Sequence, residues 1–444
     1  MQDFIKNNNF NNKNQINHKN TRKAWCAVLS SSLFFFYAFI NMTCFNGLSQ
    51  PLMDALNVSS LSISHLSAMY FYANILFLIP AGIILDKFSI RKVILFVMPI
   101  SIASTYLFSL THSYHIACVM RFIMGITSTF CLLSSAKLTG DWLSEKYAAR
   151  AISLVVTIAM LGGVFAQQMP SIMFFISKIF NNNIYSATYN WQDLLKIISI
   201  IGIICYVIIF LLLKDAPSFK SNKDLNNSKN INKIKKNGWI FALKNKQNYL
   251  LGFLTNFLST PIMILGALWG SSYLTEVKHM SISAAHSCCS LLFIGLIIGS
   301  PFFGWASDIL KNRKTPIIYG VIGSIISVLM IIYSNNYADN NLTNILMPVL
   351  FLLLGFFTAS QVISYAIIIE VNPPEYCAFS ESIASTIIMS SGAIFQPLFG
   401  YLITHGSYKE SMMIFPIVFV LSLFICFWIK TEKSREFNQL STSI

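Results

Sequence analysis

An arginine lies within an otherwise apolar stretch in the first third of the chain. Arg121 precedes Phe122 and Ile123, about six residues into a predicted span over 115–139. A charge at that depth in a bilayer costs at least about 2.5–3.5 kcal/mol, so such residues are functional candidates. No acidic residue lies at comparable depth in any predicted span, which favours pairing of Arg121 with the carboxylate of an anionic or zwitterionic ligand. The alternative is structural: hydrogen bonds from Arg121 to backbone carbonyls of a neighbouring helix.

Charged residues also recur at matching places in the two halves of the chain. Each half has a loop with the pattern Gly-x3-Asp-x4-Arg-Lys, and the second copy follows the first at an offset of 222 residues. Duplicated halves are a known plan for carriers, in which two bundles rock about a midplane site. The pattern comprises Gly82, Asp86, Arg91 and Lys92 in the first half, and Gly304, Asp308, Arg313 and Lys314 in the second.

We interpret these loop charges as a gate latch. Asp86 can meet the N-terminus of another helix, and Arg91 can meet an acid at the end of the fourth span, such as Asp141. Such pairs would hold one side of the protein shut in one state and break in the other. The alternative makes these residues topology determinants and solvated loop charges. The matching places in the second half are occupied by Asp308, Arg313 and Glu370.

Uncharged polar residues at helical spacing form a candidate substrate-binding set in spans 1, 4, 7 and 10. Any one of them is more often an interhelical hydrogen bond than a ligand contact, so the argument depends on the set as a whole. The predicted members besides Arg121 are Tyr37, Asn41, Ser128, Asn256, Trp269, Gln361 and Tyr365. His286, near the outer end of span 8, could relay protons, or it could be structural.

The elements that position these residues are predicted from the composition. Hydrophobic residues make up 55% of the 444 residues and charged residues 11%, against about 25% charged in soluble proteins. Apolar runs long enough to cross a bilayer recur along the chain, and they are continuous rather than alternating, which predicts helices instead of barrel strands. We predict an all-α membrane protein with twelve spans, at roughly 25–48, 62–85, 93–110, 115–139, 151–175, 195–213, 248–274, 282–304, 315–333, 344–369, 381–403 and 411–429.

The positions of the basic residues predict the orientation. The formal net charge is +14, and of the 31 Lys and Arg residues 26 fall in segments assigned to the cytoplasm, four on the outside and one within a span. This is the positive-inside asymmetry of a membrane protein. We therefore expect a multi-pass protein of the plasma membrane, here a bacterial inner membrane, with both termini in the cytoplasm. A nucleic-acid partner is not expected.

One basic connection divides the chain. Residues 214–247 contain nine Lys and separate six spans from six. The domains are therefore a polar N-terminus, a first six-helix bundle, this linker, a pseudo-symmetric second six-helix bundle and a tail. Apolar residues in the later linker alternate with lysines, which suggests a short helix in the headgroup region, although a disordered linker is the alternative. The five boundaries are 1–24, 25–213, 214–247, 248–430 and 431–444.

The sequence lacks the motifs that metal binding, phosphate binding and nucleophilic catalysis require. The nine cysteines are scattered without metal-ligand spacing, so no metal site or disulfide framework is predicted. The sequence has no Gly-rich phosphate loop and no nucleophile–base pair, so we expect neither a cofactor, nor an enzyme, nor an ATP-driven pump.

The duplicated loop resembles the signature loop of the major facilitator superfamily, and Arg121-x3-Gly125 is similar to a motif of its fourth span. Ser89 stands where that family usually has a glycine. The regions 137–170 and 370–397 resemble a bacterial branch that includes carriers of amino acids, peptides and small organic acids. The resemblance implies a twelve-helix carrier with the candidate residues of spans 1, 4, 7 and 10 around a central cavity.

Taken together, these features predict a secondary transporter of a small polar solute, with a proton as candidate coupling ion. The solute would be an amino acid, a peptide or an organic anion, moved by alternating access through a monomer in the lipid bilayer. A uniporter fits equally well. The alternative class is a non-transporting membrane sensor or scaffold built on a carrier fold.

Overall fold

The regular structure of the protein is helical in all the residues that the computed structural model describes. These residues are 18–143, 145–180, 190–215, 240–334, 340–373 and 376–430. Twelve helices of 20 to 31 residues are long and apolar enough to cross a membrane. The predicted fold class and number of spans are confirmed.

The first half of the chain supplies six of these spans. Most contain a serine, a proline or a glycine, yet they stay helical because the tertiary packing of the bundle satisfies the backbone. The helices are α2 (His18–Thr43), α3 (Phe45–Leu56), α4 (Ser60–Lys87), α5 (Ile90–Leu110), α6 (Tyr114–Trp142), α7 (Glu145–Phe180) and α8 (Trp191–Leu212).

The second half supplies the other six, and several of its spans are interrupted. The elements are α11 (Lys246–Pro261), η2 (Ile262–Trp269), α12 (Gly270–Glu276), α13 (Ile282–Ile309), α14 (Lys314–Tyr333), α15 (Asn340–Thr358), η3 (Ala359–Gln361), α16 (Val362–Val371), α17 (Cys377–His405), α18 (Tyr408–Met412) and α19 (Ile414–Trp428).

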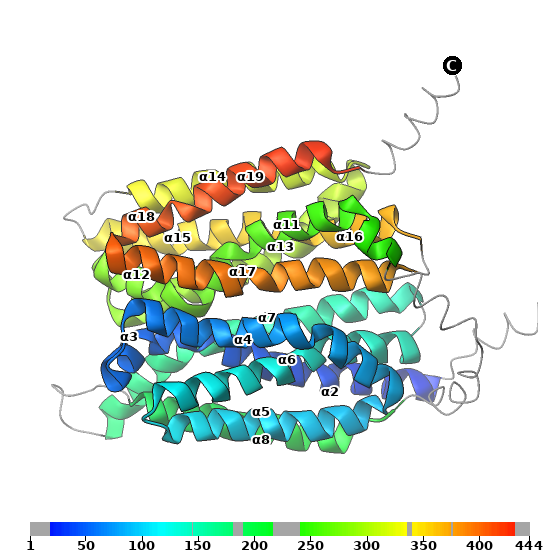
Figure 1. Ribbon diagram of the computed structural model, residues 1–444, viewed down its shortest axis with the longest axis horizontal. Helices are drawn as coiled ribbons and strands as arrows, with labels where there is room; N and C mark the ends of the chain where they lie inside the picture. The colour runs from blue at the N-terminus through cyan, green and yellow to red at the C-terminus, as the bar shows by residue number, and fades with distance from the viewer. Residues whose placement is uncertain are drawn as a thin grey trace, which may run out of the picture.

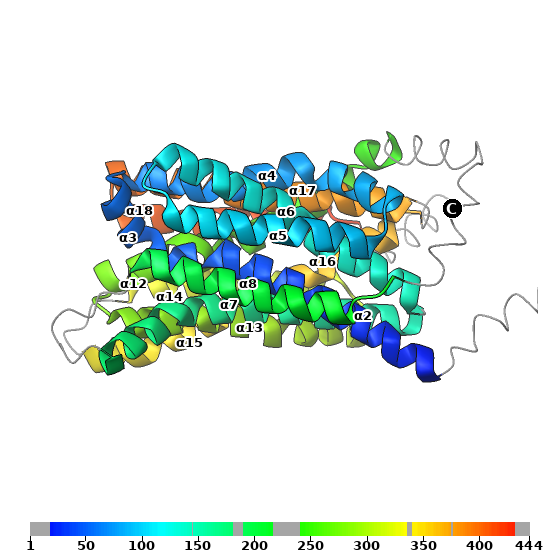
Figure 2. The same ribbon diagram turned by 90° about the horizontal axis from the view of Figure 1, so that it is seen from below.

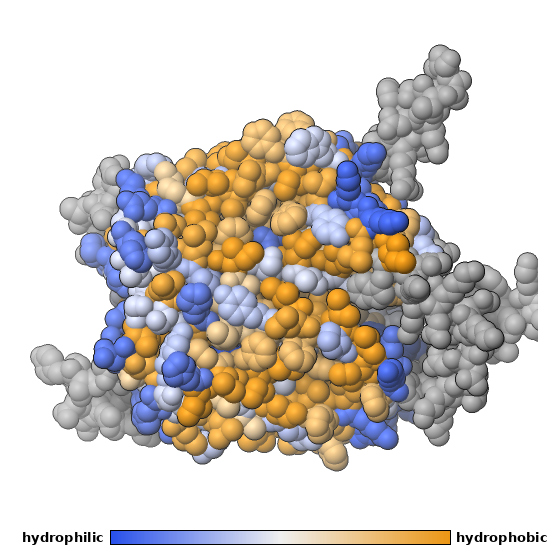
Figure 3. All heavy atoms as spheres, in the orientation of Figure 1, coloured by the Kyte–Doolittle hydropathy of each residue, from blue (hydrophilic) through white to orange (hydrophobic). Residues whose placement is uncertain are grey.

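Each half forms its own bundle, and the two bundles pack side by side (Figures 1 and 2). The α17 helix packs along α4, and α13 packs along α7. We call the end of the molecule at which α8 ends and α11 begins the linker side, and the opposite end the far side. On the face seen in Figure 3, hydrophobic residues form a broad band and hydrophilic residues gather at the two ends. This distribution suits a helix bundle whose middle faces lipid.

The first span differs from the prediction of one helix over 25–48. The α2 helix ends at Thr43, and after a turn at Cys44 a separate helix, α3, begins. Side chains take up backbone carbonyls at this break: Arg121 donates to the carbonyls of Asn41 and Met42. A helix can break where such partners replace its own hydrogen bonds.

The seventh span changes from α-helix to π-helix where the sequence carries helix-breaking residues. After Pro261 the chain widens into the π-helical segment η2 before continuing as α12. Proline cannot donate its backbone nitrogen, and π-helical turns are a common way to absorb the resulting mismatch. The π-helical segment begins directly after Pro261 and contains Gly266.

The end of the linker is docked on the second bundle. Residues 240–244 are helical, and Asn245 Nδ2 donates to Asn372 Oδ1 at 2.8 Å. Asn372 in turn donates to Asn248 Oδ1 at 2.8 Å and accepts from the Ser380 hydroxyl at 2.9 Å. This amide cluster joins the linker to the ends of α11, α16 and α17. The earlier linker, including Trp239 and Lys236, lies outside the described residues.

Candidate functional site

The two bundles meet through hydrogen bonds at the far side. Ser271 of α12 donates its backbone N–H to Asn46 Oδ1 of α3 at 2.9 Å, and its hydroxyl donates to the Asn46 carbonyl. One turn later, the hydroxyls of Ser49 and Ser272 share a hydrogen bond with an Oγ–Oγ distance of 3.1 Å. These four residues are almost completely buried. The α3 helix is therefore tied to the end of the seventh span.

A glutamine of the first bundle reaches into the widened turn of η2. Gln167 of α7 donates Nε2 to the Gly266 carbonyl at 2.6 Å and accepts from Asn46 Nδ2 at 2.6 Å. From the other side Gln396 of α17 donates Nε2 to the Met263 carbonyl at 2.6 Å. The two glutamines thus supply donors to carbonyls of η2, one from each bundle.

Further contacts close the same side. The Trp269 indole donates to Ser64 Oγ at 3.2 Å, and Gln168 Nε2 donates to Ser290 Oγ at 2.8 Å. Where both partners belong to the described residues, every hydrogen bond between the bundles joins their far-side halves. We call the set Asn46, Ser49, Ser64, Gln167, Gln168, Gly266, Trp269, Ser271, Ser272 and Ser290 the far-side gate.

The spacing between α4 and α17 changes along their length. A Cβ atom built on Gly392 would lie 2.5 Å from the Phe71 ring, so the helices touch there. A Cβ atom built on Gly82, which lies three turns nearer the linker side on α4, would meet no atom within 4 Å. In Figure 1 the ribbons of α4 and α17 also lie farther apart at the linker side than at the far side, so this helix pair is in contact at the far side and in the middle and separates toward the linker side.

Arg121 is fully buried in the first bundle. Besides its bonds to the carbonyls of Asn41 and Met42, its guanidinium lies 4.0 Å from the Phe45 ring centroid and 4.7 Å from that of Tyr70. A cation is favourable both at the C-terminal carbonyls of a helix and over an aromatic face. In this conformation the contacts of Arg121 are those of the structural alternative, and its carboxylate-binding role stays a prediction.

Two other predicted members point toward the supporting helices of their own bundle. The Tyr37 hydroxyl donates to Thr105 Oγ1 of α5 at 3.1 Å, and Thr105 donates to Asn41 Oδ1 at 3.0 Å. Gly202 of α8 packs on the Tyr37 ring. The structure therefore places Tyr37 and Asn41 between α2, α5 and α8, away from the second bundle.

Three of the remaining predicted members form hydrogen bonds within their own bundles, whereas Trp269 bonds across to the other bundle. Ser128 accepts from Asn74 Nδ2 at 2.8 Å. Asn256 donates Nδ2 to Ser390 Oγ at 3.1 Å, and Gln361 Oε1 accepts from the Ser259 hydroxyl at 2.5 Å. Ser128, Gln361 and Tyr365 are only partly buried. Among the described residues no hydrogen bond joins a predicted member of one bundle to a predicted member of the other, and their shared role in substrate binding stays a prediction.

The loop charges of the first half contact Lys137 and the end of α8, and the predicted meeting of Asp86 with a helix N-terminus stays a prediction. Asp86 pairs with Lys137 of α6, with 3.0 Å between Oδ1 and Nζ. Arg91 donates Nη2 to the Phe210 carbonyl at 3.2 Å and its backbone N–H to Asp215 Oδ1 at 3.0 Å. The expected contact between Arg91 and Asp141 is therefore wrong for this conformation. Asp215, which follows α8, caps the N-terminus of α5 instead, because its carboxylate accepts the free N–H groups there.

The loop charges of the second half form the expected cluster. Arg313 lies 2.6 Å from Asp308 and 2.8 Å from Glu370, and its Nη1 also donates to Ser307 Oγ at 3.0 Å. Partial burial opposes the charge of Arg313, but the hydrogen bonds to the two acids outweigh it and raise the pKa of Arg313. All four residues belong to one bundle, so in this conformation the cluster ties α13, α14 and α16 together and does not bridge the bundles.

Comparison with known proteins identifies the family. The family model of the Major Facilitator Superfamily matches residues 31–281 and again residues 249–442. The chain belongs to the major facilitator superfamily. It is accordingly a membrane transport protein. No curated protein sequence matches the chain.

Solved structures of other superfamily members share its fold. A bacterial homolog of the human lysosomal transporter Spinster, in an inward-facing and unoccupied conformation, superposes with a TM-score of 0.72 at 17% identity, covering 94% of this chain and 98% of that one. The same homolog in an occupied, inward-facing conformation gives 0.69 at 16% identity, with 90% and 96% covered. The nucleoside transporter NupG gives 0.68 at 14% identity, with 91% and 99% covered.

Sequence reasoning missed most of the far-side gate of this superfamily member. Polar residues are common at the ends of membrane spans, so they do not stand out in the sequence. Four gate residues lie at such positions: Asn46, Ser49, Ser271 and Ser272. Gln167 appeared only as part of a family resemblance. The available signal was the spacing of small polar residues on the last turns of spans 1 and 7, which face each other only after the halves are packed.

Proposed function

We propose that the protein is a secondary transporter that moves a small polar solute across the membrane by alternating access. The observation that carries this proposal is the one-sided closure of the interface. Among the described residues, hydrogen bonds between the bundles lie in the far-side halves, while α4 and α17 separate toward the linker side. A carrier must have a second state in which the far side opens and the linker side closes.

The orientation follows from the charges. The linker carries nine Lys, and positive loops remain in the cytoplasm. We therefore assign the linker side to the cytoplasm of a bacterial inner membrane and regard the structure as inward-facing. The chain would act as a monomer, because each bundle already finds its partner within the same chain.

The solute class is proposed from the polar character of the interface. Amide and hydroxyl groups on both bundles suit a solute with hydrogen-bonding groups, such as an amino acid, a peptide or an organic anion. One of the structural neighbours is a nucleoside transporter, which adds nucleosides as a class to be tested. A proton is the candidate coupling ion, and uniport is the alternative.

Uptake into liposomes that contain the purified protein tests this proposal. Labelled amino acids, dipeptides, organic acids and nucleosides are supplied with and without an imposed pH gradient. We expect saturable uptake of one class, and accumulation against a gradient only if a proton is coupled. Ligand-induced thermal stabilisation without uptake of that ligand would support the sensor or scaffold alternative instead.

A gate variant provides the control for that assay. Asn46 of α3 contacts both Ser271 and Gln167, so Asn46→Leu should remove several far-side bonds at once. We expect it to change the uptake rate. Asn344→Leu in the second turn of α15, where the side chain is exposed, serves as a far-side control outside the gate, and it should leave uptake unchanged.

A further inference from the structure

A buried histidine lies at the edge of the far-side gate. His286 is in the second turn of α13, its side chain is only 2% exposed, and its Nδ1 atom has no hydrogen-bond partner. A Cβ atom built on Gly47 of α3 would lie 3.2 Å from His286 Cε1, so the ring lies against the first bundle. Buried ring nitrogens are usually hydrogen-bonded, which makes this orphaned atom unusual.

The surface of α13 that carries His286 is the surface that meets the first bundle. Ser290, one turn later, accepts from Gln168 of α7. Phe293, a further turn along, would contact a Cβ atom on Gly163 of α7 at 2.7 Å. Residues three or four positions apart share one face of a helix. His286 therefore becomes uncovered when the far sides of the two bundles separate.

No described charge compensates a proton on this imidazole. On α13 itself the neighbouring titratable groups are the buried thiols of Cys288 and Cys289. On α3 the acid is Asp54, which is exposed and accepts from Gln50, and on α12 it is Glu276, which accepts from Tyr408. On α7 the residues Glu145, Lys146 and Arg150 lie at the opposite end, and Lys178 near the far-side end is a cation, which cannot compensate a second positive charge. The elements α15 and η2 carry no ionisable residue.

Protonation would place an unpaired charge in this closed interface and would put a hydrogen without an acceptor on Nδ1. Burying an unpaired charge is strongly unfavourable, whereas the same imidazolium in water is readily accommodated. The neutral ring fits the closed gate, and the charged ring fits only a conformation in which water reaches it. A proton that binds one of two conformations better shifts the balance toward that conformation.

We propose that His286 is a proton-binding site that makes the far-side gate sensitive to pH, so that acidification of the far side favours the conformation open to that side. The proposal rests on the alternating access argued above and adds a proton as the ligand that regulates it. The sign follows from linkage: the open form binds the proton, so its share grows as the pH falls. The ratio of open to closed forms can change by at most about tenfold per pH unit for one such site.

Fluorescence energy transfer within single full-length molecules in liposomes tests the proposal without a substrate. Dyes are attached through non-natural amino acids at Asp54 of α3 and Lys409 of α18, two exposed far-side residues of different bundles. This leaves the native cysteines in place. We expect the low-transfer, open population to increase between pH 8 and pH 5 in the wild-type sequence.

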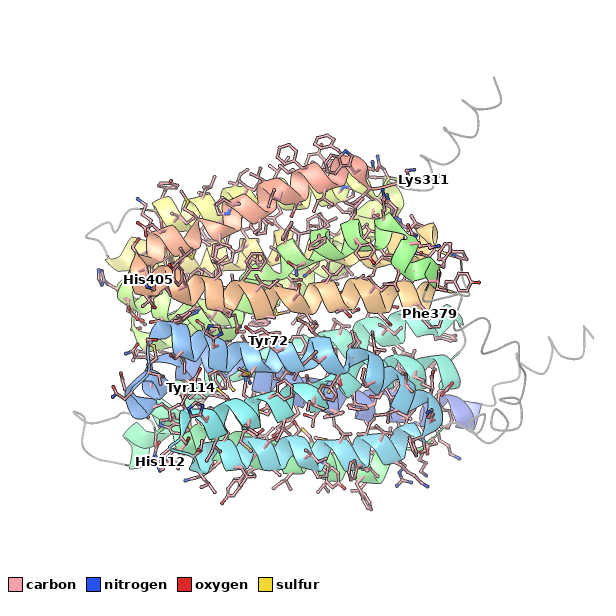
Figure 4. The ribbon with its side chains drawn as sticks, viewed as in Figure 1. Tyr72, His112, Tyr114, Lys311, Phe379 and His405 are labelled. Carbon is pink, nitrogen blue, oxygen red and sulfur yellow. The ribbon has the colours of Figure 1, made fainter. Side chains whose placement is uncertain are left out.

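Two variants give the decisive comparison. His286→Gln should be open to the same extent at every pH in that range, whereas His112→Gln should respond like the wild-type sequence. His112 is exposed in the loop before α6 at the far side (Figure 4). His286→Phe, which fills the same space without a titratable atom, repeats the test if the glutamine variant has a lowered melting temperature.

The outcomes separate this inference from the proposed function. The proposed proton site would be contradicted if the open population of the wild-type sequence did not change with pH, or if the His286→Gln variant responded to pH like the wild-type sequence. Loss of the response in both His286 variants, with retention in His112→Gln, supports it. A pH-dependent gate in a protein that transports none of the tested solutes would contradict only the transport proposal.

Discussion

At the scale of single residues, the contacts of Arg121 are compatible with a structural role in this conformation and with carboxylate binding in another. Its donors bond to the carbonyls at the break between α2 and α3, and its guanidinium lies between Phe45 and Tyr70. Arg121→Gln should therefore lower the melting temperature, because buried carbonyls lose their donors at a penalty of about 1–3 kcal/mol each. Arg121→Lys should retain part of the stability, since an ammonium can still donate to these carbonyls.

Ligand affinity measured on the same preparations tests the carboxylate-binding prediction. If Arg121 binds a substrate carboxylate in another conformation, both variants should lose most affinity, because lysine lacks the planar fork that holds a carboxylate by two bonds. Full affinity in a variant with a lowered melting temperature would leave Arg121 a purely structural residue.

The cluster around Arg313 gives a second prediction at this scale. Arg313→Gln and Asp308→Asn should slow transport more than they weaken substrate binding, because the cluster fixes how α13, α14 and α16 move together and touches no gate residue. Lys314→Gln, at the next position and without a described ion pair, is the matched control. The measurements are transport rate and equilibrium affinity in liposomes. Equal loss of both quantities in the Arg313 variant would contradict the assignment.

At the scale of elements, the π-helical segment η2 accepts one hydrogen bond from the opposite bundle and a similar one from its own bundle, so the two can be compared. Gln167 and Gln396 each donate to an η2 carbonyl at 2.6 Å, but only Gln167 comes from the opposite bundle. Gln167→Leu should increase the far-side-open population, whereas Gln396→Leu should lower the melting temperature without that shift. The same energy-transfer pair reports the populations. An identical response of the two variants would show that η2 does not link the bundles.

The interruptions of the spans also show what the sequence could predict. Pro261 is a local signal for the π-helical segment of the seventh span, because a proline lacks the donor that a regular α-helix needs. The break at Cys44 has no such local signal, since it depends on Arg121, which is distant in sequence. The partner of Asp86 was missed for the same reason: which of several nearby charges makes a contact depends on how the helices rotate. Apolar runs define the spans, but side-chain pairing between them is a tertiary property.

At the scale of the whole molecule, the two bundles and the basic linker predict a single orientation. Reporter fusions after Lys223 and after Lys430 should both report the cytoplasm, because 26 of the 31 basic residues fall in segments that we assign to that side, and positive loops stay in the cytoplasm. A fusion after Asn340, at the far side, is the control and should report the opposite compartment. Activity of an externally restricted reporter at Lys223 would reverse the inward-facing assignment.

The far-side gate consists of amides, hydroxyls, backbone groups and one indole. Opening it therefore separates no formal charges while His286 is neutral. Salt screens charges and leaves neutral hydrogen bonds largely unaffected, so ionic strength should hardly change how often the gate opens. The membrane potential changes the free energy of a conformational change only when charge moves across the membrane, by about 2.3 kcal/mol per elementary charge per 100 mV. It should therefore also have little effect on these uncharged contacts. A change in membrane potential should thus hardly alter how often the gate opens while His286 is neutral. Opening would depend on the membrane potential only after His286 has bound a proton.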